Sequence, residues 1–201
     1  MRSISRQSLR RMFTKKWIII LASSSKFYQH KTSATPKRYM NIIETFNTIR
    51  DVPYRIPLTS NEVDNCCSGK ARMLKVYFDK EGYESRYRVC EFRWPALGLP
   101  QSILSVPHDD LSSHVYLEVK INDKWIDVDP TWDMAINSIF KSNQWDGKSN
   151  TTVAVPVISK YDDEKSDSIM SNETPEIIEK NLTVNGLFYR VFNDWLDQIR
   201  N

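Results

Sequence analysis

The feature that most constrains the fold is a strict alternation of apolar and polar residues along His114–Ile121. Such alternation is typical of a strand with one buried face. Asn122-Asp123 follows, and this pair tolerates the positive φ angles of a two-residue hairpin turn. Lys124–Pro130 then returns with apolar residues at alternate positions. The sequence therefore predicts an antiparallel hairpin, in which the apolar pairs are Leu117 with Val128 and Val119 with Ile126.

The polar face of this hairpin carries an imidazole and a carboxylate. The predicted register puts Asp129 opposite Tyr116 and diagonal to His114. Diagonal neighbours on one face of a sheet lie roughly 7–8 Å apart, which is within side-chain reach. A change of register by two residues would keep both groups on the same face and separate them. Strand parity therefore predicts that His114 and Asp129 share a face of the sheet. The distance between them depends on the pairing register.

An amphipathic helix is expected to carry Cys67 in its first turn, with Asp64 or Asn65 as its N-cap and Gly82 as its left-handed stop. A thiol in the first turn lies at the positive end of the helix dipole. Such a position lowers a cysteine pKa below the ~8.5 of a free thiol. Cys67 is therefore the candidate nucleophile. The buried face of the helix is predicted to consist of Cys67, Ala71, Leu74 and Phe78.

The other two cysteines have different expected roles. Cys66 is rotated away from the apolar face of the helix, and Cys90 in the middle of a strand is expected to be a small core residue. Three cysteines, two of them adjacent, do not make a disulfide framework and favour a reduced, intracellular setting. Cys66, Cys67 and His114 lack the spacing of a zinc site, so we expect no metal and no cofactor.

Three blocks of the chain resemble the transglutaminase-like superfamily, within the broader papain-like cysteine fold. The histidine block is His114, Glu118 and Val119, and the aspartate block WIDVDPTWD contains Asp129-Pro130-Thr131. The resemblance covers about Met40 to Asp133. The family commonly has glycine two residues before the nucleophile, where this chain has Asn65. The nucleophile block follows the rhythm C-x-x-x-A-x-x-L…G-[IY]-x-x-R with Cys67, Ala71, Leu74, Gly82, Tyr83 and Arg86.

The resemblance implies an α+β fold, in which the first helix of the core carries the cysteine and packs on an antiparallel sheet, and a C-terminal helix closes the domain. It implies a Cys67, His114 and Asp129 triad that acts on amide bonds of protein or peptide substrates through a thioester, either as a peptidase or amidase or by amine transfer. One alternative is an inactive transglutaminase-like module that binds peptides. A second is acyl transfer from a thioester cofactor, as in arylamine N-acetyltransferases.

A side-chain donor for the oxyanion of such a reaction is not obvious from the sequence. Tyr54, Asn65 and Trp94 are candidates for this role or for the wall of the cleft, although the favoured interpretation of each is a structural role. His108 precedes two aspartates and is a competing base. Because it lies in the loop expected over Pro95–Ser113, it is predicted to be a solvated surface histidine.

The charge distribution predicts two regions, a basic leader over residues 1–39 and a folded domain over 40–201. The first 40 residues hold ten basic and no acidic side chains, whereas the other 18 of the 28 basic residues are outnumbered by all 25 acidic ones. This balance argues against a nucleic-acid-binding core. Trp17–Ala22 is too short to span a bilayer. The oligomeric state is left open.

The leader itself has two interpretations. It fits an organellar transit peptide, or it is a dispensable extension before a true start at Met40. The protein is accordingly expected in the cytoplasm, or in an organelle if the leader is a transit peptide. His30 within the leader is expected to be a bystander.

Periodicity predicts the remaining elements less sharply. A helix is expected over Met40–Asp51, ending before Pro53, and a strand over Thr151–Ile158. Tyr161–Glu173 is expected to be a charged, mobile connection. Thr174-Pro175 should cap a short helix over Glu176–Asn181. A separate closing helix over Gly186–Arg200 is expected to pack through Leu187, Val191, Trp195 and Ile199.

Overall fold

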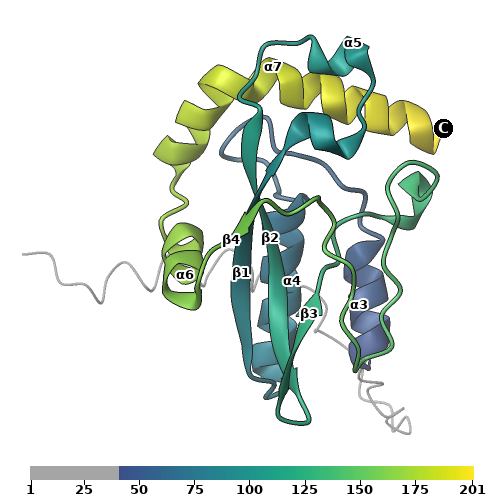
Figure 1. Cartoon of the computed structure of the whole chain (residues 1–201), viewed down its shortest axis with the longest axis vertical. Helices are drawn as coiled ribbons and strands as arrows, with labels where there is room; N and C mark the ends of the chain where they lie inside the picture. The colour runs from purple at the N-terminus through teal and green to yellow at the C-terminus, as the bar shows by residue number, and fades with distance from the viewer. Residues whose placement is uncertain (1–40) are drawn as a thin grey trace, which may run out of the picture. The chain divides into compact units, whose positions relative to one another are not determined.

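The computed structural model describes residues 41–201, so the leader predicted for residues 1–39, together with His30, lies outside the described part of the chain. The fold is α+β, with a four-stranded antiparallel sheet in the order β3-β2-β1-β4 (Figure 1). The strands are β1 (Ser85–Arg93), β2 (Leu111–Ile121), β3 (Lys124–Val128) and β4 (Ser159–Lys160). The α-helices are α3 (Ile42–Arg50), α4 (Cys67–Lys80), α5 (Gln101–Leu104), α6 (Asp163–Ser171) and α7 (Pro175–Arg200).

The predicted hairpin is confirmed as β2 and β3. Asn122 and Asp123 form the turn with φ angles of 50° and 64°. Leu117 pairs with Val128, and Val119 pairs with Ile126, as the alternation predicts. The pairing register of the hairpin is therefore encoded locally, by strand parity and by a turn that accepts positive φ.

The helix predicted to carry Cys67 in its first turn is confirmed as α4. Ala71, Leu74 and Phe78 are fully buried, and Gly82 follows with a φ of 79°. The predicted cap is wrong, because Cys66 occupies the N-cap position in an extended conformation and its side chain makes no cap hydrogen bond. The helix therefore begins with its first backbone N–H groups uncovered by a capping side chain.

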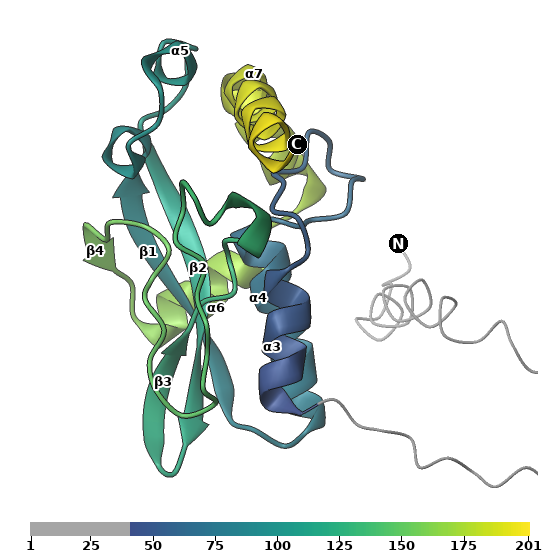
Figure 2. The same cartoon turned by 90° about the vertical axis from the view of Figure 1, so that its right-hand side faces the viewer.

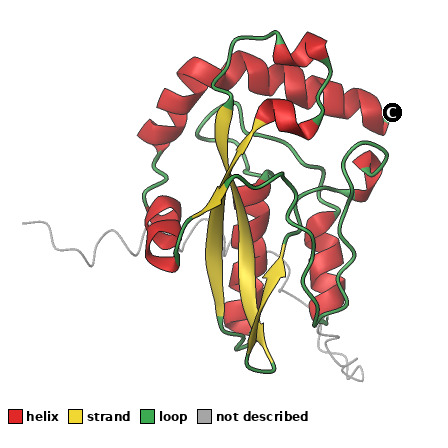
Figure 3. Cartoon of the chain, in the orientation of Figure 1, coloured by secondary structure: helices red, strands yellow, loops and turns green. Residues whose placement is uncertain are grey.

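Two helices cover one face of the sheet, as Figure 2 shows for α3 and α4. The helix predicted before Pro53 is confirmed as α3, which begins with a capping box between Asn41 and Glu44. Phe46 of α3 and Trp145 of a later loop join the cluster that α4 forms with β2 and β3. Burial of these apolar side chains drives the helices onto the sheet. Figure 3 shows the helices around the central strands.

The strand predicted over Thr151–Ile158 is wrong. The segment bends at Ala154 and Val155 and has no regular pairing, and only Ser159–Lys160 joins the sheet, as β4. Pro156 lacks the N–H that a ladder requires. The backbone N–H of Thr151 instead donates to the carbonyl oxygen of Asp127 at 2.8 Å, and that of Ile158 donates to the carbonyl oxygen of Glu91 at 2.8 Å.

The mobile connection predicted over Tyr161–Glu173 is also wrong, because most of it is helix α6. Ser166 is fully buried, and its hydroxyl accepts the backbone N–H of Val89 at 3.1 Å. Asp162 caps the helix by accepting the backbone N–H of Lys165 at 2.8 Å. The segment was predicted to be mobile because it is rich in charged residues, yet it forms a helix that packs on β1.

The tail forms one helix, α7, where two were predicted. Thr174 caps it by accepting the backbone N–H of Ile177, and it continues through Gly186 to Arg200. The predicted packing face is confirmed for Val191, Trp195 and Ile199, which pack partly buried against the core, and is wrong for Leu187, which is 61% exposed. The most buried residues of the helix lie one position further along the chain, at Phe188, Phe192 and Leu196, in an aromatic cluster with Trp94.

The loop predicted over Pro95–Ser113 contains the 3-10 turn Trp94–Leu97, helix α5 and the start of β2. The prediction of a solvated His108 is wrong. Its side chain is 4% exposed, its ring stacks on Phe188 at 4.0 Å, and its Nδ1 lies 2.6 Å from the carbonyl oxygen of Val106. His108 is therefore a packed core residue. In the described residues, no helix is long and apolar enough to cross a membrane.

Candidate active site

Cys67 is the first residue of α4 and lines a cleft of about 720 Å³. Its side chain is half-buried. The uncapped N–H groups and the helix dipole favour negative charge at this position. Local structure alone therefore promotes the thiolate of Cys67.

The loop before α4 passes very close to the start of the helix. A Cβ at Gly69 would lie 1.8 Å from the carbonyl oxygen of Asp64, so only glycine permits this approach. The Asp64 carboxylate accepts the backbone N–H of Cys66 at 2.9 Å and the hydroxyl of Ser68 at 2.8 Å. These contacts fix the backbone that carries Cys67.

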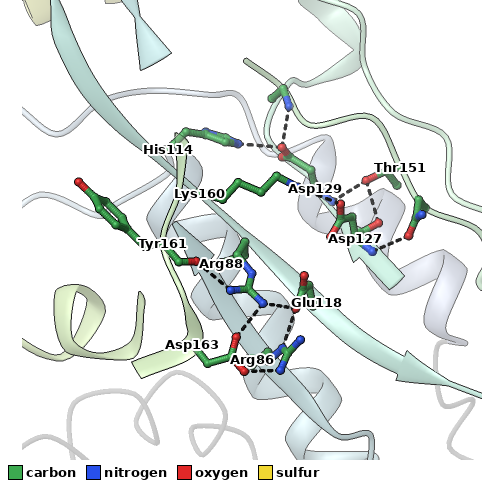
Figure 4. A network of polar contacts seen from close by, with 12 residues as sticks. Arg86, Arg88, His114, Glu118, Asp127, Asp129, Thr151, Lys160, Tyr161 and Asp163 are labelled. Carbon is green, nitrogen blue, oxygen red and sulfur yellow. Dashed lines mark hydrogen bonds and ion pairs between the residues drawn. The ribbon is translucent and has the colours of Figure 1, made fainter. Parts of the chain in front are cut away.

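The structure brings His114 of β2 and Asp129, just after β3, into direct contact, as Figure 4 shows. The His114 Nε2–H donates to Asp129 Oδ2 at 2.7 Å, and the two side chains are 3% and 0% exposed. The polar face predicted for the hairpin is therefore covered at this end of the strand. A buried charge-assisted hydrogen bond of this kind fixes the tautomer and the orientation of the ring.

Two segments beyond the hairpin hold the Asp129 carboxylate. Its Oδ2 accepts a second hydrogen bond from the backbone N–H of Ala154 at 2.8 Å, and its Oδ1 accepts the backbone N–H of Thr131 at 3.0 Å. The Asp129 backbone N–H donates to the Thr151 hydroxyl at 2.8 Å. The segment over 151–154 therefore helps to orient the carboxylate.

The ionisation of Cys67, His114 and Asp129 is mutually dependent. The pKa of Cys67 is lowered well below its usual range, first by hydrogen bonding with Cys66 and then, against the effect of burial, by the His114 imidazole. Burial opposes charge on His114, but Asp129 and Cys67 outweigh it and raise the pKa of His114 to about 10. Burial likewise opposes the charge on Asp129, yet His114 keeps the pKa of Asp129 below its usual range. These directions favour a thiolate–imidazolium pair.

The other two cysteines are poor nucleophiles. Hydrogen bonding with Cys67 and burial raise the pKa of Cys66 well above its usual range, and burial raises that of Cys90 to about 12. Cys66 also lines the cleft and packs against the aromatic cluster, so it is not turned toward solvent. Cys90 is fully buried in the middle of β1, opposite His114 in the register.

Lys70 is a support that sequence reasoning missed. It is fully buried below the helix start, and its Nζ donates to the carbonyl oxygens of Arg50 and Thr131, each at 2.8 Å. Burial lowers its pKa to about 8. Lys70 thus ties α3 and the loop after Asp129 to α4. The sequence signal that could have identified Lys70 is the position of a lysine on the apolar face of a predicted helix.

Tyr54 lies in the cleft and is held by the C-terminal helix. Its backbone N–H donates to Asp133 Oδ2 at 2.8 Å, and its carbonyl oxygen accepts Arg200 Nη2 at 2.9 Å. Its ring packs on Trp132 with centroids 4.7 Å apart. Burial and the nearby Cys67 raise the pKa of Tyr54 well above its usual range, so its hydroxyl stays protonated.

The other two predicted cleft residues lie in different places. Trp94 lines the cleft and is 4% exposed. Asn65 is not among the lining residues, and its backbone forms an isolated bridge with Arg55. The structure therefore brings Tyr54 and Trp94, but not the side chain of Asn65, to the cleft that contains Cys67.

A network on the sheet anchors the wall of the cleft that α6 forms. Arg86 and Arg88 of β1 both pair with Glu118 of β2, at 2.6 and 2.7 Å, and both pair with Asp163 at the start of α6 (Figure 4). Arg72 of α4 pairs with Asp64 and with Glu173, which follows α6. The segment that carries Glu173 is thus tied across the cleft to α4.

Within residues 41–201, no cluster of three or more His, Cys, Asp or Glu side chains could hold a metal ion. Comparisons of the chain with protein-family models, with curated proteins and with solved structures found no match.

Proposed function

We propose that this chain is a transglutaminase-like, papain-like cysteine enzyme that performs acyl chemistry on amide bonds. The observation that carries the proposal is the buried 2.7 Å contact between His114 and Asp129, next to a thiol at the start of a helix. A nucleophile, a base and an orienting carboxylate from three separate segments form the arrangement that activates a thiol.

The reaction proceeds in two steps. The Cys67 thiolate attacks the amide carbon, and the resulting tetrahedral oxyanion collapses as the His114 imidazolium gives its proton to the leaving amine. A thioester remains on Cys67. Water or a second amine, deprotonated by His114, then attacks the thioester and releases the product and the thiolate. Asp129 stays ionised throughout and stabilises the imidazolium.

Two donors are available for the oxyanion. One is the backbone N–H of Cys67 at the start of α4, and the other is the hydroxyl of Tyr54. Loss of one such donor lowers kcat by about 10²–10³ in a well-characterised protease. Tyr54→Phe should therefore lower kcat by about 10² without lowering stability, since the ring keeps its contact with Trp132. Unchanged kcat in Tyr54→Phe would remove Tyr54 from this role.

The first test is the reactivity of the three thiols of the full chain with iodoacetamide at about pH 6, where an ordinary thiol of pKa ~8.5 is protonated. Cys67 should be alkylated far faster than Cys66 or Cys90, as measured by peptide mass mapping. Cys90→Ala is the matched control and should keep the rapid labelling, whereas Cys67→Ala should lose it. Equal labelling of all three thiols contradicts the proposal.

The second test is turnover on peptides, with hydrolysis followed by product release and amine transfer followed by incorporation of a fluorescent primary amine. Either activity should disappear in Cys67→Ala. A reactive Cys67 thiolate with neither activity would favour the module that binds peptides without cleaving them. Retained turnover in Cys67→Ala would exclude Cys67 as the nucleophile.

A further inference from the structure

The cleft beside Cys67 has a preformed aromatic wall. Trp94 is fixed by Phe92 and Phe188, each with ring centroids 5.0 Å away, and Tyr54 is fixed by Trp132. The residues of this wall that line the cleft are Tyr54, Phe92, Trp94, Trp132, Val155 and Tyr189. Because neighbouring rings hold these side chains in place, the wall can receive an apolar group with little loss of conformational entropy.

Tyr54 and Trp94 bring hydrogen-bond donors to this wall. Both residues line the cleft, and they are 5% and 4% exposed. A ligand that covers these donors must offer them acceptors, because a donor buried without a partner is unfavourable. Carbonyl oxygens are the acceptors that a peptide offers at regular intervals.

The charges that line the cleft are unsuited to a phosphorylated carrier. Arg72 is already paired with two carboxylates, which leaves Lys165 as the other basic side chain among the lining residues. Glu62, Asp64 and Glu173 also line the cleft. Recognition of phosphates depends on unpaired arginine and lysine. The lining therefore disfavours an acyl group delivered on a cofactor that carries several phosphates.

We propose that the substrate is an extended peptide with a bulky apolar side chain near the reacting amide, seated against the wall of Trp94, Trp132 and Tyr189 with its carbonyl oxygens on the Tyr54 and Trp94 donors. This inference rests on the proposed function. It specifies which substrates the Cys67 thiolate attacks. Peptides that place an acidic side chain in the aromatic pocket are expected to be poor substrates.

The test uses irreversible dipeptidyl acyloxymethyl ketones on the full chain. Phenylalanine, alanine or aspartate is placed at each of the two positions in turn, with alanine at the other. At one of the positions, the phenylalanine probe should label Cys67 about tenfold or more faster than the alanine probe, and the aspartate probe should be slowest. Labelling is measured as a second-order rate by mass spectrometry.

Two variants of α7 test the pocket itself. Leu182 lines the cleft, whereas Val184 on the same helix is 51% exposed and is not a lining residue. Leu182→Asp should reduce the preference for phenylalanine to less than about threefold, because the carboxylate faces the apolar group. Val184→Asp is the matched control and should keep the preference.

Two results would overturn the substrate assignment. One is an equal labelling rate for the phenylalanine and aspartate probes at both positions, and the other is acylation of Cys67 by acetyl-coenzyme A as rapid as labelling by the best probe. Iodoacetamide separates these results from failure of the proposed function. A Cys67 that iodoacetamide labels rapidly but that shows no side-chain preference refutes only the substrate class.

Discussion

Replacing Asp129 with asparagine tests how strongly the carboxylate controls the thiol. The buried Asp129 oxygens accept three hydrogen bonds, from His114 Nε2 at 2.7 Å, from the Ala154 N–H at 2.8 Å and from the Thr131 N–H at 3.0 Å. Asparagine has nearly the same shape but offers one acceptor oxygen and one NH₂ group. One of the three N–H donors must then face the NH₂ group of the asparagine, and the negative charge of the carboxylate is lost.

The expected magnitude follows from this geometry. A hydrogen bond to a charged group contributes about 1.5–3 kcal/mol, and 1.36 kcal/mol corresponds to one pKa unit. After the opposing effect of burial, Asp129 makes the largest contribution to raising the pKa of His114 to about 10. Asp129→Asn should therefore lower the pKa of His114 by roughly 1–2 units and raise that of Cys67, because the imidazole becomes a weaker proton acceptor.

The assay is the rate of Cys67 alkylation by iodoacetamide as a function of pH. At about pH 6, Asp129→Asn should react roughly tenfold more slowly than the unmodified chain, since the thiolate population falls. Above about pH 10, where His114 loses its proton, the two rates should converge. Asp127→Asn, two residues earlier on β3, is the matched control and should leave the profile unchanged. Superimposable profiles for Asp129→Asn and the unmodified chain would refute the reasoning.

Two stability predictions follow from the neighbourhood of α4. Gly69→Ala should lower the free energy of unfolding by about 3 kcal/mol, because the new Cβ overlaps the carbonyl oxygen of Asp64. Gly186→Ala in α7 should raise the free energy of unfolding by up to about 1 kcal/mol, because the new Cβ would make an ordinary contact with Leu182 Cβ at 3.8 Å. Urea denaturation measures both, and equal effects would contradict the close approach. Lys70→Met should lower the free energy of unfolding by about 2 kcal/mol, because the carbonyl oxygens of Arg50 and Thr131 lose their donor. Unchanged stability in Lys70→Met would show that these carbonyls find other partners.

Sequence patterns predicted the parts of the site that local rules determine. The parity of β2 and β3 and the Asn122-Asp123 turn fix the hairpin register without any distant contact. The spacing of Ala71, Leu74 and Phe78 fixes which side of α4 is buried. These signals repeat every two residues or every three to four, so they remain legible without knowledge of the tertiary structure.

The residues that hold the catalytic side chains in place follow no such periodic pattern in the sequence. Ala154 lies 25 residues after Asp129, and its backbone N–H reaches the carboxylate from a segment with no ladder of its own. A backbone donor is available at almost every residue, so nothing in the sequence identifies Ala154 as the partner. The start of the packing face of α7 was misplaced for a related reason, since apolar residues occur at both Leu187 and Phe188 and only the Trp94 cluster selects between them.

The role of α7 is consequently larger than that of a closing helix. Asn193 hydrogen-bonds both the N–H and the carbonyl oxygen of Ile56, at 3.0 and 2.8 Å, and Arg200 bridges the carbonyl oxygen of Tyr54 and Asp133 Oδ2. The segment that presents Tyr54 to the cleft is therefore held by the last two turns of the chain. Because the same helix contributes Leu182 to the cleft wall, the donor and the pocket depend on one element. Movement of α7 would disturb both together, while the contact between His114 and Asp129 lies on the sheet and its flanking loops and would persist.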